Sequence, residues 1–72
     1  MTLVLVDELT RHDLNVLFVQ ARVQKQDVSR YLGMRPDLFA SQLNGKRAVS
    51  EEWVPKVRAA VAALVEQREA QG

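Results

Sequence analysis

The chain has 72 residues, which is the size of one small domain. It has no cysteine and a single histidine, which argues against a disulfide framework and a transition-metal site. Hydrophobic residues at 47% and charged residues at 26% are typical of a folded globular chain. The longest strongly apolar run, residues 3–6, is far shorter than the roughly 20 residues of a membrane span. We therefore expect a soluble, cytoplasmic domain with no membrane partner.

The net charge is only +1, but the positive charge is unevenly distributed. Residues 1–21 hold one cation against three carboxylates, residues 22–47 hold six against two, and residues 48–72 hold three against four. The middle third is therefore basic and both ends are acidic. This distribution fits a surface that faces phosphate groups, and an ordinary solvated surface is the alternative interpretation.

The first predicted helix runs from about residue 8 to 22, after an N-terminal arm over residues 1–7. Asp7 and Thr10 are equally good N-caps, so two starts are open. The apolar residues of this segment follow the i, i+3, i+4, i+7 spacing of one buried helix face. They are Leu14, Leu17, Phe18 and Ala21.

The next two predicted helices are short. The second spans about residues 25–32 with Val28 facing inward, and Gly33 ends it because glycine readily adopts the left-handed conformation. The third spans about residues 36–44 and begins with Pro36, whose φ already suits the first turn. The pair Asn44 and Gly45 ends it, and Phe39 and Leu43 face the core.

The fourth helix begins near Ser50, a good N-cap, or at Pro55 after a short turn over residues 50–53. Trp53 is expected to fill part of the core. The apolar face is lost after about Glu66, so residues 67–72 are expected to fray. The predicted core positions of this helix are Trp53, Val57, Ala60, Val61 and Leu64.

Two short helices joined by a glycine-containing turn form a helix-turn-helix unit, here over about residues 25–44. The segment resembles the helix-turn-helix of phage repressor and Cro proteins, the XRE-like family, and the resemblance extends over about residues 10–66. It implies that residues 1–72 form one compact all-α, lambda-repressor-like domain with four or five helices. The matching residues are Val28, Ser29, Leu32, Gly33, Met34, Phe39, Leu43, Asn44, Gly45, Lys46 and Arg47.

Three features of the segment differ from the usual family pattern. Ser29 stands where the family usually has alanine, at a close crossing of the two helices. Gln42 stands where an apolar residue is common, so the third helix is either positioned differently or leans on a neighbour. Arg35 and Pro36 replace the usual Ser or Thr cap, which changes the contacts available in the groove.

The resemblance implies that helix 36–44 lies in the DNA major groove with its N-terminal residues at the base edges. Arg35 is then a candidate for a bidentate contact with guanine, and Ala40 for contact with a thymine methyl group. Ser41 can meet either kind of base edge. Asp37 either accepts a hydrogen bond from cytosine or only stabilises the helix N-terminus.

Phosphate contacts are expected on both sides of this helix. Gln24 and Lys25 lie at the start of the second helix, where free amide groups attract anions. Lys46 and Arg47 follow the third helix, and Asn44 either ends that helix or contacts the DNA backbone. With about four to six phosphates neutralised, affinity should fall steeply with salt.

The sequence thus predicts sequence-specific binding of duplex DNA by a transcriptional repressor or regulator of phage or mobile-element type. Its place would be the cytoplasm of a bacterial cell or infected host, on the nucleoid. Its partner would be an inverted-repeat operator. The alternative is a small helical protein-interaction or oligomerisation module that does not bind DNA.

Two segments are candidate surfaces for a homodimer: the fourth helix, where small residues such as Ala59 and Ala62 lie outside the core stripe, and residues 3–6. Packing within one chain is the alternative for both. Residues 3–6 otherwise pack on their own core or form a strand. His12 has no serine or cysteine partner in a recognisable motif, so no enzymatic activity is expected. No cofactor and no metal ion are implied.

Overall fold

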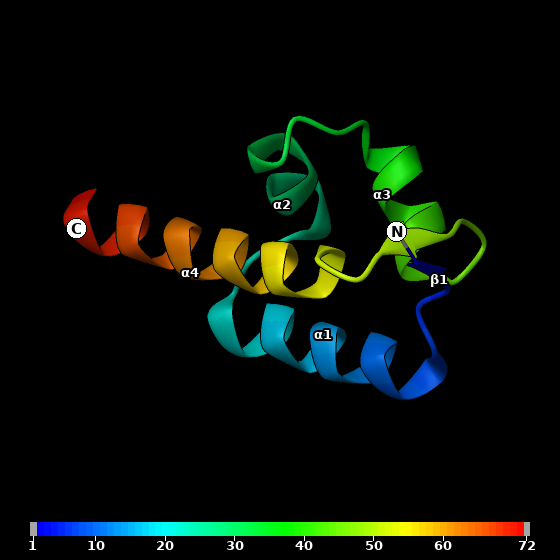
Figure 1. The fold of residues 1–72 in the computed structure, drawn as a ribbon. Coiled ribbons are helices and arrows are strands. Elements are labelled where there is room, and N and C mark those ends of the chain that lie inside the picture. The colour runs from blue at the N-terminus through cyan, green and yellow to red at the C-terminus, as the bar shows by residue number, and fades with distance from the viewer. Residues whose placement is uncertain (1, 72) are drawn as a thin grey trace.

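The computed structural model describes residues 2–71, which form four helices and a two-stranded antiparallel sheet (Figure 1). The predicted compact four-helix domain is confirmed. Residues 3 and 4 form a short strand, which was one of the alternatives for residues 3–6. None of the helices within residues 2–71 is both long and apolar enough to cross a membrane. The elements in chain order are β1 (Leu3–Val4), α1 (Glu8–Ala21), α2 (Lys25–Tyr31), α3 (Pro36–Leu43), β2 (Val49–Ser50) and α4 (Trp53–Gln71).

α1 begins after Asp7, which is its N-cap in place of Thr10. The Asp7 carboxylate accepts a hydrogen bond of 2.7 Å from the backbone N–H of Thr10, and this bond satisfies one of the free donors of the first turn. Hydrogen bonding to Thr10, by its side chain and then its backbone, lowers the pKa of Asp7 below the ordinary value of 3.8. The charged form of this carboxyl group is therefore stabilised by the fold.

α2 and α3 end in the same way, each with a glycine in the left-handed conformation. Gly33 has φ +72° and Gly45 has φ +77°. After α2, the N–H of Met34 donates to the carbonyl of Ser29 at 2.8 Å, and after α3 the N–H of Lys46 donates to that of Ser41 at 2.9 Å. This pattern satisfies carbonyl groups that a helix end leaves free. The ends predicted at the two glycines are confirmed.

The sheet fastens the N-terminal segment to the chain ahead of α4. Leu3 pairs with Ser50 and Val4 pairs with Val49. Ser50, one of the predicted caps of the fourth helix, is instead a strand residue. Val6 then enters the core with 6% of its surface exposed, so residues 3–6 are not a free arm.

α4 begins at Trp53, between the two predicted starts. Pro55 is tolerated there because it lies in the first turn, where backbone N–H groups have no partner inside the helix. The helix continues to Gln71, so the expected fraying from residue 67 is wrong for residues 67–71, and residue 72 lies outside the described part. The guanidinium of Arg68 donates to the carbonyls of Ala21 at 3.0 Å and Arg22 at 2.7 Å. These bonds join the last turns of α4 to the end of α1.

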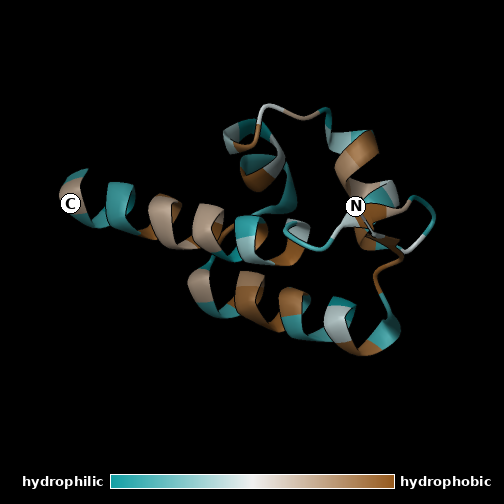
Figure 2. Cartoon of the chain, viewed as in Figure 1, coloured by the Kyte–Doolittle hydropathy of each residue, from teal (hydrophilic) through white to brown (hydrophobic). Residues whose placement is uncertain are grey.

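Hydrophobic positions along the helices gather on the sides that face one another, as the colouring of Figure 2 shows. The ring of Phe39 is central, with its centroid 6.4 Å from that of Phe18 and 5.7 Å from that of Trp53. The expected core role of Trp53 is confirmed. The buried hydrophobic residues are Val6, Leu14, Phe18, Val23, Val28, Phe39, Leu43, Val49, Trp53, Val57, Ala60 and Val61.

Candidate nucleic-acid interface

α2 and α3 are short helices joined by residues 32–35, and they pack against each other closely. Ser29 lies in this contact with none of its surface exposed, and its hydroxyl donates to the carbonyl of Gln26 at 2.8 Å. A small residue is needed where two helices cross closely, and the intrahelical bond satisfies its polar group. The serine predicted at the crossing is therefore accommodated without an unpaired hydroxyl.

The orientation of α3 depends on a contact between α3 and α4. The side-chain oxygen of Gln42 accepts a hydrogen bond of 3.0 Å from the indole N–H of Trp53. Gln42 is partly buried and Trp53 is 6% exposed, so this bond satisfies a buried donor. This contact corresponds to the alternative in which the third helix leans on a neighbour, because Gln42 of α3 is bonded to Trp53 of α4.

The exposed start of α3 holds two of the predicted base-reading residues. The Nε of Arg35 lies 3.6 Å from a carboxylate oxygen of Asp37, and both side chains are highly exposed, at 85% and 75%. An ion pair this exposed contributes little to stability, so either side chain can leave it at small cost. Asp37 also lies in the first turn of α3, where a negative charge is favourable.

The other two predicted base-reading residues are less accessible. Ala40 and Ser41 are both half-buried. The hydroxyl of Ser41 donates to the backbone carbonyl of Asp37 at 3.0 Å, so its oxygen is left to act as an acceptor. The structure therefore gives Arg35 and Asp37 more freedom to contact a ligand than Ala40 and Ser41.

The predicted phosphate-binding residues flank α3 on both sides along the chain. Lys25 precedes it at the start of α2, whereas Lys46 and Arg47 follow it in the turn toward β2, and all three are exposed. Among residues 2–71 the one ion pair is that of Arg35 and Asp37, so these three cations have no carboxylate partner there. Their charges are available to an anionic ligand.

Asn44 and Gln24 are exposed as well, but their polar groups differ in availability. Asn44 is the C-cap of α3, and its backbone N–H donates to the carbonyl of Ala40 at 2.9 Å. The side-chain oxygen of Gln24 accepts a hydrogen bond of 2.8 Å from the amide of Gln26. The amide nitrogen of Gln24 remains the group that can donate to a phosphate.

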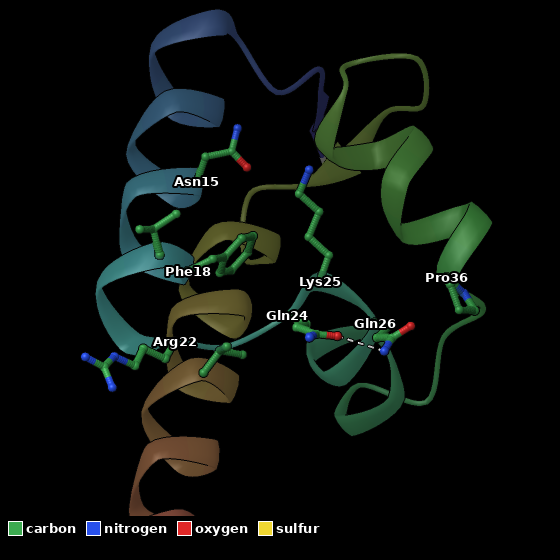
Figure 3. Close-up of a pocket in the computed structure, with 9 residues that line it drawn as sticks. Asn15, Phe18, Arg22, Gln24, Lys25, Gln26 and Pro36 are labelled. Atoms are coloured by element: carbon green, nitrogen blue, oxygen red, sulfur yellow. Dashed lines mark hydrogen bonds between the residues drawn. The ribbon is translucent and has the colours of Figure 1, made fainter.

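A cleft separates the second half of α1 from the starts of α2 and α3. Figure 3 shows Lys25 projecting into it, with Asn15 of α1 on one side and Pro36 on the other. The first turns of α2 and α3 therefore open onto the same side of the molecule. The residues that line the cleft are Asn15, Phe18, Val19, Arg22, Val23, Gln24, Lys25, Gln26 and Pro36.

Two polar residues that line this cleft were not among the site residues predicted from the sequence. Gln26 is exposed one residue after Lys25, and the run of polar residues 24–26 is a signal that could have included it. Asn15 belongs to α1 and lines the cleft only because the fold places the second half of α1 across from the starts of α2 and α3. No local pattern in the sequence marks it.

Two further observations concern metal ligands and the single histidine of the chain. Within residues 2–71, no group of three or more His, Cys, Asp or Glu residues is placed to hold a metal ion. His12 is exposed on α1. The comparisons with protein-family models, with curated proteins and with solved structures gave no match to this chain.

Proposed function

We propose that this domain binds duplex DNA, with α3 in the major groove and the cations on either side of it on the phosphates. The observation that carries the proposal is the placement of charge. Lys25, Lys46 and Arg47 are exposed without carboxylate partners among residues 2–71, and Arg35 is exposed at the start of α3. Cations that precede and follow a short helix along the chain, with another at its exposed start, are suited to position the start of that helix on a duplex.

The size of α3 suits this role. Like any α-helix, α3 has a diameter of about 10–12 Å with its side chains, which fits a major groove about 12 Å wide. Residues 32–35 connect α2 to α3 and contain Gly33. This connection has the length of a helix-turn-helix connection. Arg35 is the proposed base-reading residue, because its ion pair with Asp37 is weak enough to be exchanged for a guanine edge.

The resemblance to phage repressor and Cro proteins supports a regulator of transcription over other DNA-binding roles. It also supports an inverted-repeat operator and a cytoplasmic, nucleoid-associated location in a bacterial cell or infected host. The interface of one such domain is small, about 600–1,000 Å². Binding by a single copy is therefore expected to be weak, and regulation would need two copies or a larger protein.

Fluorescence anisotropy of the purified domain on a randomised duplex pool, repeated at several salt concentrations, tests the proposal. We expect affinity to fall steeply as salt rises, because several phosphates are neutralised. Selection from the same pool should enrich a preferred sequence. Absence of binding at low salt would reject the proposal in favour of a protein-interaction module.

A further inference from the structure

α1 has a second apolar face, opposite the one that packs on the core. Leu14 and Phe18 are buried, whereas Val16, two residues from each and so turned by about 200° around the helix, faces outward. Leu9, Val16 and Val19 are 73%, 38% and 77% exposed. Three aliphatic side chains on the solvent side of one helix are unusual for a surface that stays in water.

These residues form a continuous outer face together with His12. One shallow hollow is lined by Leu9 and His12 among others, and a second by His12, Val16 and Val19 among others. His12 is common to both, so the two hollows are neighbours along the helix. We call Leu9, His12, Val16 and Val19 the α1 outer face.

The spacing within the α1 outer face is the same in both directions. Its members are separated by three, four and three residues. If two α1 helices pack antiparallel about a two-fold axis, Leu9 of each copy meets Val19 of the other, and His12 meets Val16. A two-fold interface requires this kind of self-complementarity, because the same patch supplies both halves.

The charges on one flank of the outer face favour the same arrangement. Exposed Glu8 lies there at the start of α1, and exposed Arg22 directly follows its end. In an antiparallel pair the same flanks of the two helices face each other, so each Glu8 meets the other copy's Arg22. The helix dipoles also oppose each other favourably in this orientation.

The other predicted dimer surfaces are less suitable. α4 exposes Ala59 and Ala62 but has no large exposed hydrophobic side chain within residues 53–71. Leu3, Val4 and Leu5 are exposed at 65%, 43% and 60%, but the strand Leu3–Val4 is only two residues long and offers little backbone for pairing. The exposed aliphatic surface that lies on a longer regular element is that of α1.

We propose that two copies of this chain associate through the α1 outer face, with the two α1 helices antiparallel. α1 lies along one side of the molecule, next to α4 (Figure 1). Because its buried residues Leu14 and Phe18 face the core, the outer face points away from the core, so this association leaves both copies of α3 uncovered. The proposal stands on the apolar face and its charges, and it does not depend on DNA binding.

Sedimentation equilibrium of the full chain over a wide concentration range tests the proposal. We expect a monomer–dimer equilibrium for the natural sequence and its loss in Val19→Glu, because each dimer then buries two carboxylates against apolar side chains. Ala59→Glu adds the same charge to an exposed site on α4 and should leave the equilibrium unchanged. Circular dichroism shows whether each variant is folded.

Two matched amide substitutions test the antiparallel register. Glu8→Gln removes the partner of Arg22 and should weaken the dimer. Asp13 is exposed on the other flank, near the centre of the outer face, where it would face the Asp13 of the other copy. Asp13→Asn removes that repulsion and should strengthen the dimer, although both variants lose one negative charge.

Three results would overturn the proposal. They are a natural chain that stays monomeric up to the highest concentration, a dimer lost in Ala59→Glu but kept in Val19→Glu, and amide variants that shift the equilibrium in the same direction. DNA binding is measured separately by anisotropy, and none of these variants changes α3 or the cations beside it. Failure of one proposal therefore leaves the other standing.

Discussion

The hydrogen bond between Trp53 and Gln42 determines which residue types α3 accepts at its contact with α4. An indole N–H that is buried needs an acceptor, and Gln42 supplies it at 3.0 Å. A leucine at position 42 would fill similar space but would leave the N–H unpaired. The tryptophan opposite Gln42 therefore explains a polar residue at a position that is commonly apolar in the repressors that this segment resembles.

Gln42→Leu is accordingly expected to lower the free energy of unfolding by about 1–3 kcal/mol, the cost of a buried donor without a partner. In a Trp53→Phe background the same substitution should cost much less, because no donor remains. Urea denaturation of the two single variants and the double variant measures the coupling. Equal costs of Gln42→Leu in both backgrounds would contradict the role assigned to this bond.

Asp7 links the stability of the domain to pH. Because hydrogen bonding to Thr10 lowers the pKa of Asp7 in the folded state, the folded state binds this proton less readily than the unfolded chain does. The ionised Asp7 carboxyl group therefore contributes fully to the stability of the fold above its ordinary pKa of 3.8. This contribution is lost as pH falls through the lower pKa of the folded state. Asp7→Asn should reduce stability at neutral pH and flatten the acid limb of a thermal-unfolding profile. An unchanged acid limb would mean that other carboxyl groups account for it.

Arg35 and Lys46 are expected to affect DNA binding in different ways. Arg35→Ala should cost about 1–3 kcal/mol on the preferred sequence and relax base preference, because it removes a guanine contact. Lys46→Ala should weaken binding to all sequences alike and reduce the salt slope by about one. Arg58→Ala, at an exposed site on α4, is the matched control. Loss of discrimination in Lys46→Ala alone would reverse these roles.

At the scale of elements, the two helix-ending glycines have the same backbone conformation but different surroundings. A Cβ added at Gly45 would lie 2.8 Å from the backbone carbonyl oxygen of Val6, whereas nothing lies within 4 Å of one added at Gly33. Both positions have positive φ, which costs a residue with a side chain about 1–2 kcal/mol. At Gly45 a side chain would also clash with the backbone of Val6.

Gly33→Ala is therefore expected to lower the free energy of unfolding by about 1 kcal/mol, and Gly45→Ala by clearly more. Backbone at the clashing position cannot move as easily as the end of a flexible side chain. Chemical denaturation of the two variants, compared with the natural chain, measures the difference. Equal losses would show that the segment around Val6 yields to the added carbon.

The elements that could be predicted are those with a strong local pattern. The periodic apolar residues and the two glycines placed α1, α2 and α3 within a residue or two of their observed bounds. The strands β1 and β2 could not be placed, since each has two residues and its pairing partner lies far away in the sequence. The length of α4 was underestimated because Arg68 is held by carbonyls at the end of α1, a contact with no local signal.

At the scale of the whole molecule, the candidate site was predictable as a set of residues but not as an arrangement. The charge of the middle third and the glycine-ended turns identified Lys25, Arg35, Lys46 and Arg47. The contact of Arg35 with Asp37 required side-chain positions at the start of α3, and the cleft beside Lys25 required the placement of α1 relative to the starts of α2 and α3. The α1 outer face was not predicted, because the spacing of Leu14 and Phe18 marks the buried side of this helix and says nothing about the role of apolar residues on the opposite side.

The pairing of β1 with β2 also has a consequence for the order of folding. Contacts between α2 and α3 join residues close in sequence, whereas Leu3 and Ser50 must close a loop that spans most of the chain. Closing a longer loop costs more conformational entropy, so the pairing should form after the barrier has been crossed. The folding rate should then depend little on the two strands, and their loss should appear mainly as faster unfolding. We therefore expect the N-terminal segment to slow the unfolding of the domain and to have little influence on the rate at which the domain folds.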